Sequence, residues 1–197
     1  MPTDPPRDPW PGDRPLVLAS SSPGRAAMLR AAGLNLSVLP AAIDEEAIRA
    51  ALSAEGAAPR VSARSGGALV LGADQIAECG GRCLSKPRDP AEAAEQLRFL
   101  SGRTHRLFSA AVVFDAGMPV WRHVGMARLT MHSLGESFLR EYVARNWEEI
   151  RHTVGAYRIE GEGVRLFGRI EGDPFTIIGL PLIELLTWLR ARGDIAA

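Results

Sequence analysis

The chain has 197 residues, of which 46% are hydrophobic and 23% charged, a composition typical of a globular protein with a substantial core. Basic and acidic residues balance at 23 each, which excludes a large positive field and indicates no nucleic-acid partner. The longest apolar stretch, residues 175–189, is interrupted by glycine, proline and glutamate, so no membrane span is expected. The only cysteines, Cys79 and Cys83, indicate a cytoplasmic location.

The first residues differ in composition from the rest of the chain. Residues 1–14 are rich in proline, with interleaved aspartate and arginine, and lack the basic-then-apolar order of a signal peptide. We expect a disordered extension there, followed by a single domain over residues 15–197.

A strand, a serine-rich turn and a helix are predicted at the start of this domain. The apolar run over residues 15–20 predicts a buried strand. Ser22 and Pro23 are typical of the N-cap and first turn of a helix, which we expect to end at Gly33. The serine turn and Arg25 would then lie at the positive end of the helix, where a phosphate is favoured. A plain N-cap is the alternative.

The next stretch predicts a strand, a helix and a loop. Residues 34–39 are expected to form the strand, and residues 43–52 a helix whose acidic first turn suits its dipole. These acidic residues are equally compatible with a solvated cap. Residues 55–67 are rich in glycine, alanine, serine and proline, and predict the most flexible interior loop.

Residues 68–73 predict a second buried strand, and Asp74 and Gln75 are expected where it ends. A carboxylate at such a point can hold a metal or orient a water, because the sheet fixes it while the loops leave it reachable. An aspartate that merely forms a turn is the alternative.

A hairpin is predicted over residues 76–84, around the pair Gly80-Gly81. Cys79 and Cys83 flank this turn, with no second cysteine pair and no suitably spaced histidine. We therefore expect them to be thiols in the hairpin strands and not zinc ligands.

Lysine occurs once in the chain, at Lys86, beside 22 arginines. Because the chain uses arginine for almost every other cation, the single lysine suggests a site that needs a compact ammonium, for example beside a phosphate oxygen. The alternative is that the lysine occurs there by chance. Asp89 and Pro90 then predict the start of a helix that is apolar on its inner side through Leu100.

The second half of the chain predicts strands over residues 106–114 and 120–131. Ser133 and Glu136 resemble a capping box for a helix through Ala144. The histidines share no metal-ligand spacing, so each is expected at the surface or lining a pocket. They are His105, His123, His132 and His152.

Glycines are concentrated over residues 155–163, where they let the backbone approach a ligand or turn tightly between strands. Residues 164–170 predict a strand, and residues 173–182 lead into an amphipathic helix that ends near Gly193. The sequence contains no internal repeat, Walker loop or dinucleotide fingerprint.

A series of short motifs runs from Leu16 almost to the end of the chain. The motifs are Leu18–Arg25, Ile43–Glu45, Leu71–Gln75, Leu84–Pro87, Leu100–His105, Gly155–Gly161 and Gly179–Leu182. In this order and spacing they resemble the Maf family of nucleoside triphosphate pyrophosphatases. The resemblance implies an α/β fold, with a mixed twisted sheet and flanking helices that form two lobes around a nucleotide cleft.

The resemblance also implies the reaction and the partners. Maf-like enzymes release a nucleoside monophosphate and pyrophosphate from a nucleoside triphosphate, with a divalent metal, magnesium or manganese. They are often homodimers and are linked to septum formation, which implies a cell-division partner. By motif match, Asp74 and Lys86 would be catalytic, Ser20, Ser22 and Arg25 would bind phosphates, Glu45 and Asp74 would bind metal, and Gly24, Gln75 and Glu160 would select the base.

Three residues distinguish the branches of this family. Members that act on dTTP and UTP typically read Ser-Pro-Arg-Arg, Asp-Thr and Ile-Gln-Gly, where this chain has Gly24, Gln75 and Glu160. The pattern here is similar to the branch that acts on 7-methylguanosine triphosphate. A glutamate can accept hydrogen bonds from guanine N1–H and the exocyclic amine, and it complements a ring made cationic by methylation.

The chain departs from that branch at two places. The branch often carries a tryptophan where this chain has Gly24, and an aromatic ring could stack on the cationic base whereas glycine cannot. Residues 55–67 are also shorter than in the family and have no lysine. Either Arg60 or Arg64 supplies the charge, or a catalytic cation is missing. The alternatives are therefore a dTTP or UTP pyrophosphatase, a weakened nucleotide-binding regulator of cell division, and an α/β domain whose turns only imitate the motifs.

Overall fold

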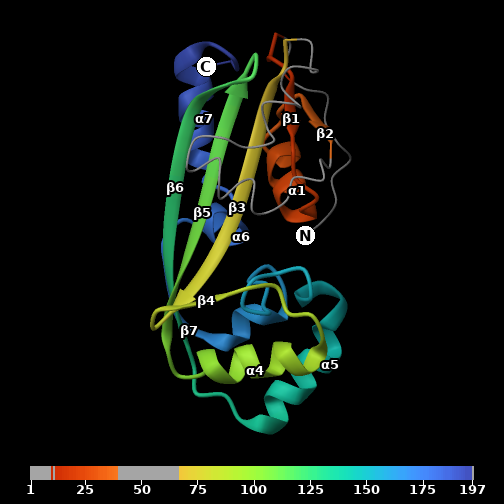
Figure 1. Ribbon diagram of the computed structural model, residues 1–197, viewed down its shortest axis with the longest axis vertical. Helices are drawn as coiled ribbons and strands as arrows, with labels where there is room; N and C mark the ends of the chain where they lie inside the picture. The colour runs from red at the N-terminus through yellow and green to blue at the C-terminus, as the bar shows by residue number, and fades with distance from the viewer. Residues whose placement is uncertain (1–9, 11, 40–66, 197) are drawn as a thin grey trace. The chain divides into compact units, whose positions relative to one another are not determined.

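The computed structural model describes residue 10 and residues 12–39 and 67–196 (Figure 1). The chain divides into two compact units. The first unit contains the residues up to Asp74, residues 110–124 and residues from Gly179 onward; the second contains residues 75–109 and 125–178. The helix predicted over residues 43–52, and all but the last residue of the loop predicted over 55–67, lie outside the described residues.

A mixed sheet carries the fold, in the strand order β2-β1-β3-β5-β6-β7, with β4 paired to β3 beside this path (Figure 1). The strands are β1 (Leu16–Leu18), β2 (Leu36–Val38), β3 (Leu69–Cys79), β4 (Arg82–Leu84), β5 (Thr104–Asp115), β6 (Met118–Met131) and β7 (Phe167–Glu171). Both β2 and β3 are parallel to β1, whereas β4 is antiparallel to β3 and β7 to β6. The prediction of an α/β fold with a mixed sheet is confirmed.

The first unit begins with the predicted strand, turn and helix. All three residues of β1 are buried, and the chain then enters α1 (Pro23–Ala31). Ser22 caps this helix and Pro23 occupies its first turn, where the missing N–H costs nothing. Gly33 follows the helix with φ +77°, which glycine adopts without steric cost. The local signals of the sequence therefore act as predicted.

An ion-pair cluster, called here the terminal clasp, joins both ends of the described chain to the β5–β6 turn. Arg14 donates to both carboxylate oxygens of Asp115, at 2.7 and 3.0 Å, and lies 3.4 Å from Asp194. Arg192 reaches Asp115 at 3.0 Å and Asp194 at 2.9 Å. The Arg14 hydrogen bond lowers the pKa of Asp115 to about 2, with help from Arg192. Next to the clasp, Asp13 Oδ1 accepts from the Ala196 backbone N–H at 3.0 Å.

The second unit packs α4 (Pro90–Leu100) and α5 (Glu136–Ile150) around its own core. Asp89 caps α4 through the Glu92 N–H at 2.8 Å, as the Asp89-Pro90 pair predicts. Leu97, Leu100 and Leu139 are almost completely buried, and burying each leucine contributes about 2 kcal/mol. The predicted hairpin is also present, because Gly80 and Gly81 both have positive φ between β3 and β4.

The prediction that a strand ends before Asp74 is wrong, because β3 continues to Cys79. Residues 69–73 are all buried, residues 74–76 are all partly exposed, and only the last positions of the strand alternate between buried and partly exposed. Pairing with β4 and β5 supplies the backbone hydrogen bonds that keep the strand extended. Asp74 therefore lies on a strand and not in a turn.

The capping box predicted at the start of α5 is also wrong. Gly135 is the N-cap, without a side-chain hydrogen bond. The carboxylate of Glu136 instead accepts from Arg98 of α4, with one bond at 2.8 Å. The helix continues past Ala144 to Ile150, because its later apolar residues still face the core.

The strand predicted over residues 164–170 starts three residues too early. A 3₁₀ turn occupies Glu162–Leu166 and β7 follows it. Gly163 lets this turn pack against the chain before it, since a Cβ there would lie 2.3 Å from the Arg158 carbonyl oxygen. The predicted C-terminal helix is α7 (Leu182–Arg192), closed by Gly193 with φ +76°. No helix among the described residues is long and apolar enough to cross a bilayer.

Candidate active site

The serine turn of the first unit is an organised hydrogen-bonding structure. Ser20 Oγ accepts from the Ser22 backbone N–H at 3.2 Å and from Arg25 Nη1 at 3.2 Å. Ser22 Oγ accepts from the Arg25 backbone N–H at 3.4 Å. The turn therefore presents hydroxyl groups and a guanidinium at the N-terminus of α1, where the helix dipole favours an anion. Gly24 lies in the first turn of the same helix.

Arg25 connects this turn to the sheet and to the segment before α7. Its Nε donates to the Gly179 carbonyl at 2.8 Å, and its Nη1 donates to the Ala73 carbonyl at 2.7 Å. Charge-assisted hydrogen bonds of this kind contribute about 1.5–3 kcal/mol each. The planar guanidinium can bridge both carbonyls, whereas a lysine could not match that geometry.

Asp74 follows Ala73 directly on β3, and its side chain is half-buried. Of the residues predicted for phosphate chemistry, the first unit thus brings together Ser20, Ser22 and Arg25 and joins them to the backbone next to Asp74. Glu45, the predicted metal ligand, lies outside the described residues.

Gln75 begins the second unit and is tied to α6 (Pro174–Ile178). Its Nε2 donates to the carbonyls of Thr176 and Ile177, at 3.1 and 2.9 Å, and lies 3.0 Å from Ser109 Oγ. The Ser109 hydroxyl itself donates to the Thr176 carbonyl at 2.7 Å. A base that used Gln75 Nε2 as a donor would have to compete with these contacts.

Lys86 is exposed in the loop between β4 and α4. The buried Gln96 of α4 steadies this loop, because its Nε2 donates to the Ser85 carbonyl at 3.1 Å. Sequence reasoning missed Gln96, although a polar residue on the inner face of a predicted amphipathic helix was a usable signal.

Glu160 belongs to a short chain of charges in the second unit. Arg158 Nη2 lies 3.4 Å from Glu160 Oε1, and Arg158 Nη1 donates to Glu149 Oε2 at 3.0 Å. Only 19% of the Glu160 side chain is exposed. Arg158 therefore helps to hold this carboxylate in one orientation.

The sequence profile of the family described as "Maf-like protein" matches residues 15–192 of this chain. This chain belongs to the Maf family. A "nucleoside triphosphate pyrophosphatase" of Roseobacter denitrificans is 50% identical over 195 residues, which covers 92% of this chain and 98% of the relative. A protein of the same name from Sphingopyxis alaskensis is 51% identical over 90% of this chain and 97% of its own. A "7-methyl-GTP pyrophosphatase" of Rhizobium etli is 48% identical over 91% of this chain and 97% of its own. The predicted family is confirmed.

A divalent metal, implied by the Maf family, would need oxygen-rich ligands. Within residues 12–39 and 67–196, no group of three or more histidine, cysteine, aspartate or glutamate side chains is close enough to hold a metal. Asp74 is the predicted ligand that lies in this part of the chain. Magnesium bound to a nucleotide typically uses one or two carboxylates together with phosphate oxygens and waters, so a single carboxylate such as Asp74 is compatible with it.

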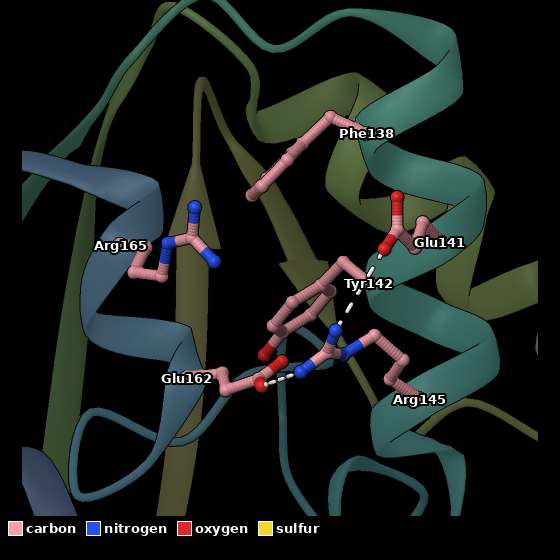
Figure 2. A pocket seen from close by; sticks show the side chains of 6 residues that line it. All are labelled: Phe138, Glu141, Tyr142, Arg145, Glu162 and Arg165. Carbon is pink, nitrogen blue, oxygen red and sulfur yellow. Dashed lines mark hydrogen bonds and ion pairs between the residues drawn. The ribbon is translucent and has the colours of Figure 1, made fainter.

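A shallow hollow of about 90 Å³ lies on the second unit of this Maf chain, between α5 and the 3₁₀ turn (Figure 2). Figure 2 shows Arg145 pointing toward both Glu162 and Glu141, while the Arg165 guanidinium lies 5.7 Å from the Phe138 ring centre. None of the predicted site residues lines this hollow. Its two arginines and two glutamates balance, so it offers no net charge to an anion.

The expectation that each histidine lies at the surface or lines a pocket is wrong for His105. Its side chain is 1% exposed, and its Nε2 lies 2.7 Å from the Tyr157 hydroxyl. Burial lowers the pKa of His105 to about 4, so the ring is neutral at pH 7. Alternation with the buried Leu107 and Ser109 along β5 was the signal that could have shown an inward-facing histidine.

Proposed function

We propose that this protein hydrolyses 7-methylguanosine triphosphate to 7-methylguanosine monophosphate and pyrophosphate. The enzyme class, a nucleoside triphosphate pyrophosphatase, is confirmed by the family match and the relatives. The serine turn is the observation that supports the chemistry best. Arg25 of this turn donates a hydrogen bond to the carbonyl of Ala73, the residue before Asp74 on β3. This arrangement combines a cradle for phosphate with a carboxylate on a fixed strand.

In the proposed reaction, a water attacks the α-phosphorus in line with the oxygen that bridges to the β-phosphorus. A new phosphorus–oxygen bond forms to the water, the bond to the bridging oxygen breaks, and pyrophosphate leaves. Asp74 orients this water and takes its proton, a role worth typically about 10²- to 10⁴-fold in rate. Ser20, Ser22 and Arg25 hold the phosphate oxygens and stabilise the developing charge.

Lys86 supplies a second cation to the triphosphate in this proposal. Its ammonium is a compact charge of the kind that pairs with a phosphate oxygen, and the Gln96 side chain donates to the carbonyl of Ser85, the residue before it. Glu45 and Asp74 are proposed to bind magnesium or manganese, which would neutralise phosphate charge. Dialysis against a chelator should then abolish turnover, and adding back either metal should restore it.

The choice of base rests on Glu160 in this proposal. A carboxylate held by Arg158 can accept hydrogen bonds from guanine N1–H and the exocyclic amine, and it complements a methylated, cationic ring. The Rhizobium etli relative named as a 7-methyl-GTP pyrophosphatase supports the same choice. Gly24 and Gln75 are the other two positions at which the branches of the family differ, and we propose that they also influence the choice of base.

The test is pyrophosphate release from 7-methylguanosine triphosphate, GTP, dTTP, UTP and inosine triphosphate, each with magnesium or manganese. The proposal expects the highest kcat/KM for the methylated nucleotide. A preference for dTTP or UTP would support the second candidate, a pyrimidine nucleotide pyrophosphatase. Gly24 keeps that candidate in view because it offers no ring to stack on a methylated base, although the pyrimidine branch typically has arginine at this position.

If no nucleotide in the panel releases pyrophosphate but adding a nucleotide raises Tm, the result would instead support a nucleotide-binding regulator of cell division. A ligand that binds the native state must stabilise it, so the shift in Tm reports binding without turnover. Neither turnover nor a shift with any nucleotide would contradict both functions.

A further inference from the structure

Residues 155–161, called here the base segment, carry Glu160 on a backbone that local preferences do not stabilise. Gly155 has φ +79° and Ala156 has φ +59°, and the second value is uncommon for a residue with a side chain. Such conformations persist only where the surrounding structure holds them. The contacts that hold this segment therefore decide where the Glu160 carboxylate lies.

Tyr157 anchors the base segment in the core of the second unit. Its ring meets that of Phe167 edge to face, with centres 4.8 Å apart, and it lies 5.5 Å from the His105 ring. Gly155 fits closely against it, because a Cβ at that position would lie 2.8 Å from Tyr157 Cε1. Tyr157 and the backbone turn before it therefore pack directly against each other.

The hydroxyl of Tyr157 has its partner on another element. His105 of β5 lies 2.7 Å from it through Nε2, and both side chains are buried. The neutral imidazole offers one donor and one acceptor, so it can satisfy the phenol in either tautomer. A buried hydroxyl without this partner would cost free energy, which makes the bond a strong positional constraint.

Two further contacts fix the stretch between Tyr157 and Glu160. Burial raises the pKa of the Tyr142 phenol of α5, and the nearby Arg158 backbone lowers it in part, so the Tyr142 hydroxyl faces that backbone. Gly163 also lies against the Arg158 backbone, with room for no side chain. Arg158 then reaches Glu160 from this fixed backbone. Because Arg158 follows Tyr157 directly in the chain, a displacement of Tyr157 would strain these contacts and shift Arg158, and through it Glu160.

We propose that the hydrogen bond between His105 and Tyr157 is a positioning device that sets base selectivity through Glu160. The inference rests on the proposed role of Glu160 in contacting the base. Both residues act through the segment and touch neither the substrate nor the reacting phosphorus. Their loss should weaken discrimination between bases more than it slows the phosphate chemistry.

The first experiment compares kcat and KM for 7-methylguanosine triphosphate and dTTP in Tyr157→Phe, which removes only the hydroxyl. We expect the ratio of the two kcat/KM values to fall about fivefold or more, mainly through KM of the methylated nucleotide. His105→Gln keeps an amide that can bond the hydroxyl, so it should fall between Tyr157→Phe and the unmodified protein. If Tyr157→Phe does not fold, His105→Gln tests the same hydrogen bond.

Leu97→Ala is the matched control, because Leu97 lies in the same core and has no hydrogen-bonding side chain. It should lower Tm while the selectivity ratio stays unchanged. Glu160→Gln tests the base role of Glu160 separately from the positioning role of the His105–Tyr157 hydrogen bond. If it changes the ratio and both Tyr157→Phe and His105→Gln leave it unchanged, the positioning role is wrong and the proposed function stands. If Glu160→Gln also leaves the ratio unchanged, the base role of Glu160 fails and the inference fails with it.

Hydrogen exchange provides a readout that needs no turnover. In Tyr157→Phe, the amides of residues 157–161 should exchange about tenfold faster or more, while those of α4 keep their protection. Unchanged protection of the base segment would overturn the inference whatever the kinetics show.

Discussion

The serine turn of the first unit and the base segment of the second are both irregular, but different forces hold them. Hydrogen bonds between residues at most five apart shape the serine turn, and the charged guanidinium of Arg25 ties it to two distant backbone carbonyls. Buried rings and a neutral histidine hold the base segment, without a local hydrogen-bonded turn of that kind. The turn that we propose to bind phosphate thus takes its shape from local signals and is anchored by a charge, whereas the segment that we propose to select the base depends on uncharged packing.

Among the changes that would test the contrast between the serine turn and the base segment, Asp74→Asn should have the largest effect on activity. The change removes a proton acceptor but keeps shape and hydrogen bonding, so kcat should fall by about 10²- to 10⁴-fold for every nucleotide. Pyrophosphate release and Tm measure activity and folding separately. Turnover at the original rate in a folded variant would exclude Asp74 as the base.

Acid should weaken the second unit first, because His105 is buried in its neutral form. Its pKa is about 4 in the folded chain and 6.5 when exposed, so the unfolded chain binds the proton more readily. The free energy of unfolding should therefore fall as pH drops from 6.5 toward 4, by about 3 kcal/mol in all. Urea unfolding at pH 7 and pH 5 measures the slope.

His105→Gln should lose that pH dependence, even if it is less stable at pH 7. His132→Gln is the control, because His132 is exposed and its loss should leave the slope in place. If the free energy of unfolding falls with pH as steeply in His105→Gln as in the unmodified protein, other groups cause the acid sensitivity.

Paired substitutions at Arg25 and Glu160 should separate phosphate binding from base choice. Arg25→Lys keeps the charge but cannot bridge both carbonyls, so kcat/KM should fall by roughly 10- to 100-fold for all nucleotides alike. Glu160→Gln should instead alter the ranking of nucleotides. If Arg25→Lys changed the ranking, the serine turn would also take part in base selection.

The smallest effect is expected in the terminal clasp, where Asp115→Asn should cost about 1–2 kcal/mol at pH 7. The pKa of Asp115 is lowered to about 2 from an ordinary value of 3.8, but a quarter of its side chain is exposed and solvent screens the pairs. This contribution is present above pH 3.8 and is lost as pH falls toward 2. The difference in Tm between variant and unmodified protein should therefore persist at pH 5 and shrink near pH 2. A constant difference would mean that the carboxylate charge is not the cause.

The parts of the fold that the sequence predicts well are those with local causes. Ser22-Pro23 starts α1, Asp89-Pro90 starts α4 and Gly80-Gly81 turns the hairpin, each through the conformation of two adjacent residues. The shape of the serine turn is predictable for the same reason, since the hydrogen bonds within it join residues at most five apart. The bonds from Arg25 to the Ala73 and Gly179 carbonyls are long-range, and the local sequence does not predict them.

The wrong predictions have causes that lie far along the chain. The polar residues that follow an apolar run predict that a strand ends at Asp74, but pairing with β4 and β5 extends β3. Glu136 bonds Arg98 of α4 and not its own helix start. His105 is buried because Tyr157, 52 residues later, accommodates its polar ring. Spacing in the sequence contains no information on such partners.

The contact between Asp13 and Ala196 has a consequence for engineering. These residues are hydrogen-bonded at 3.0 Å, so a short linker could join the two ends of the described fold. New ends could then be opened in the exposed Gly80-Gly81 turn, where an added Cβ would meet no atom within 4 Å. Such a circular permutant should fold with the same sheet order, and its new termini would lie beside β4, which leads into the Lys86 loop.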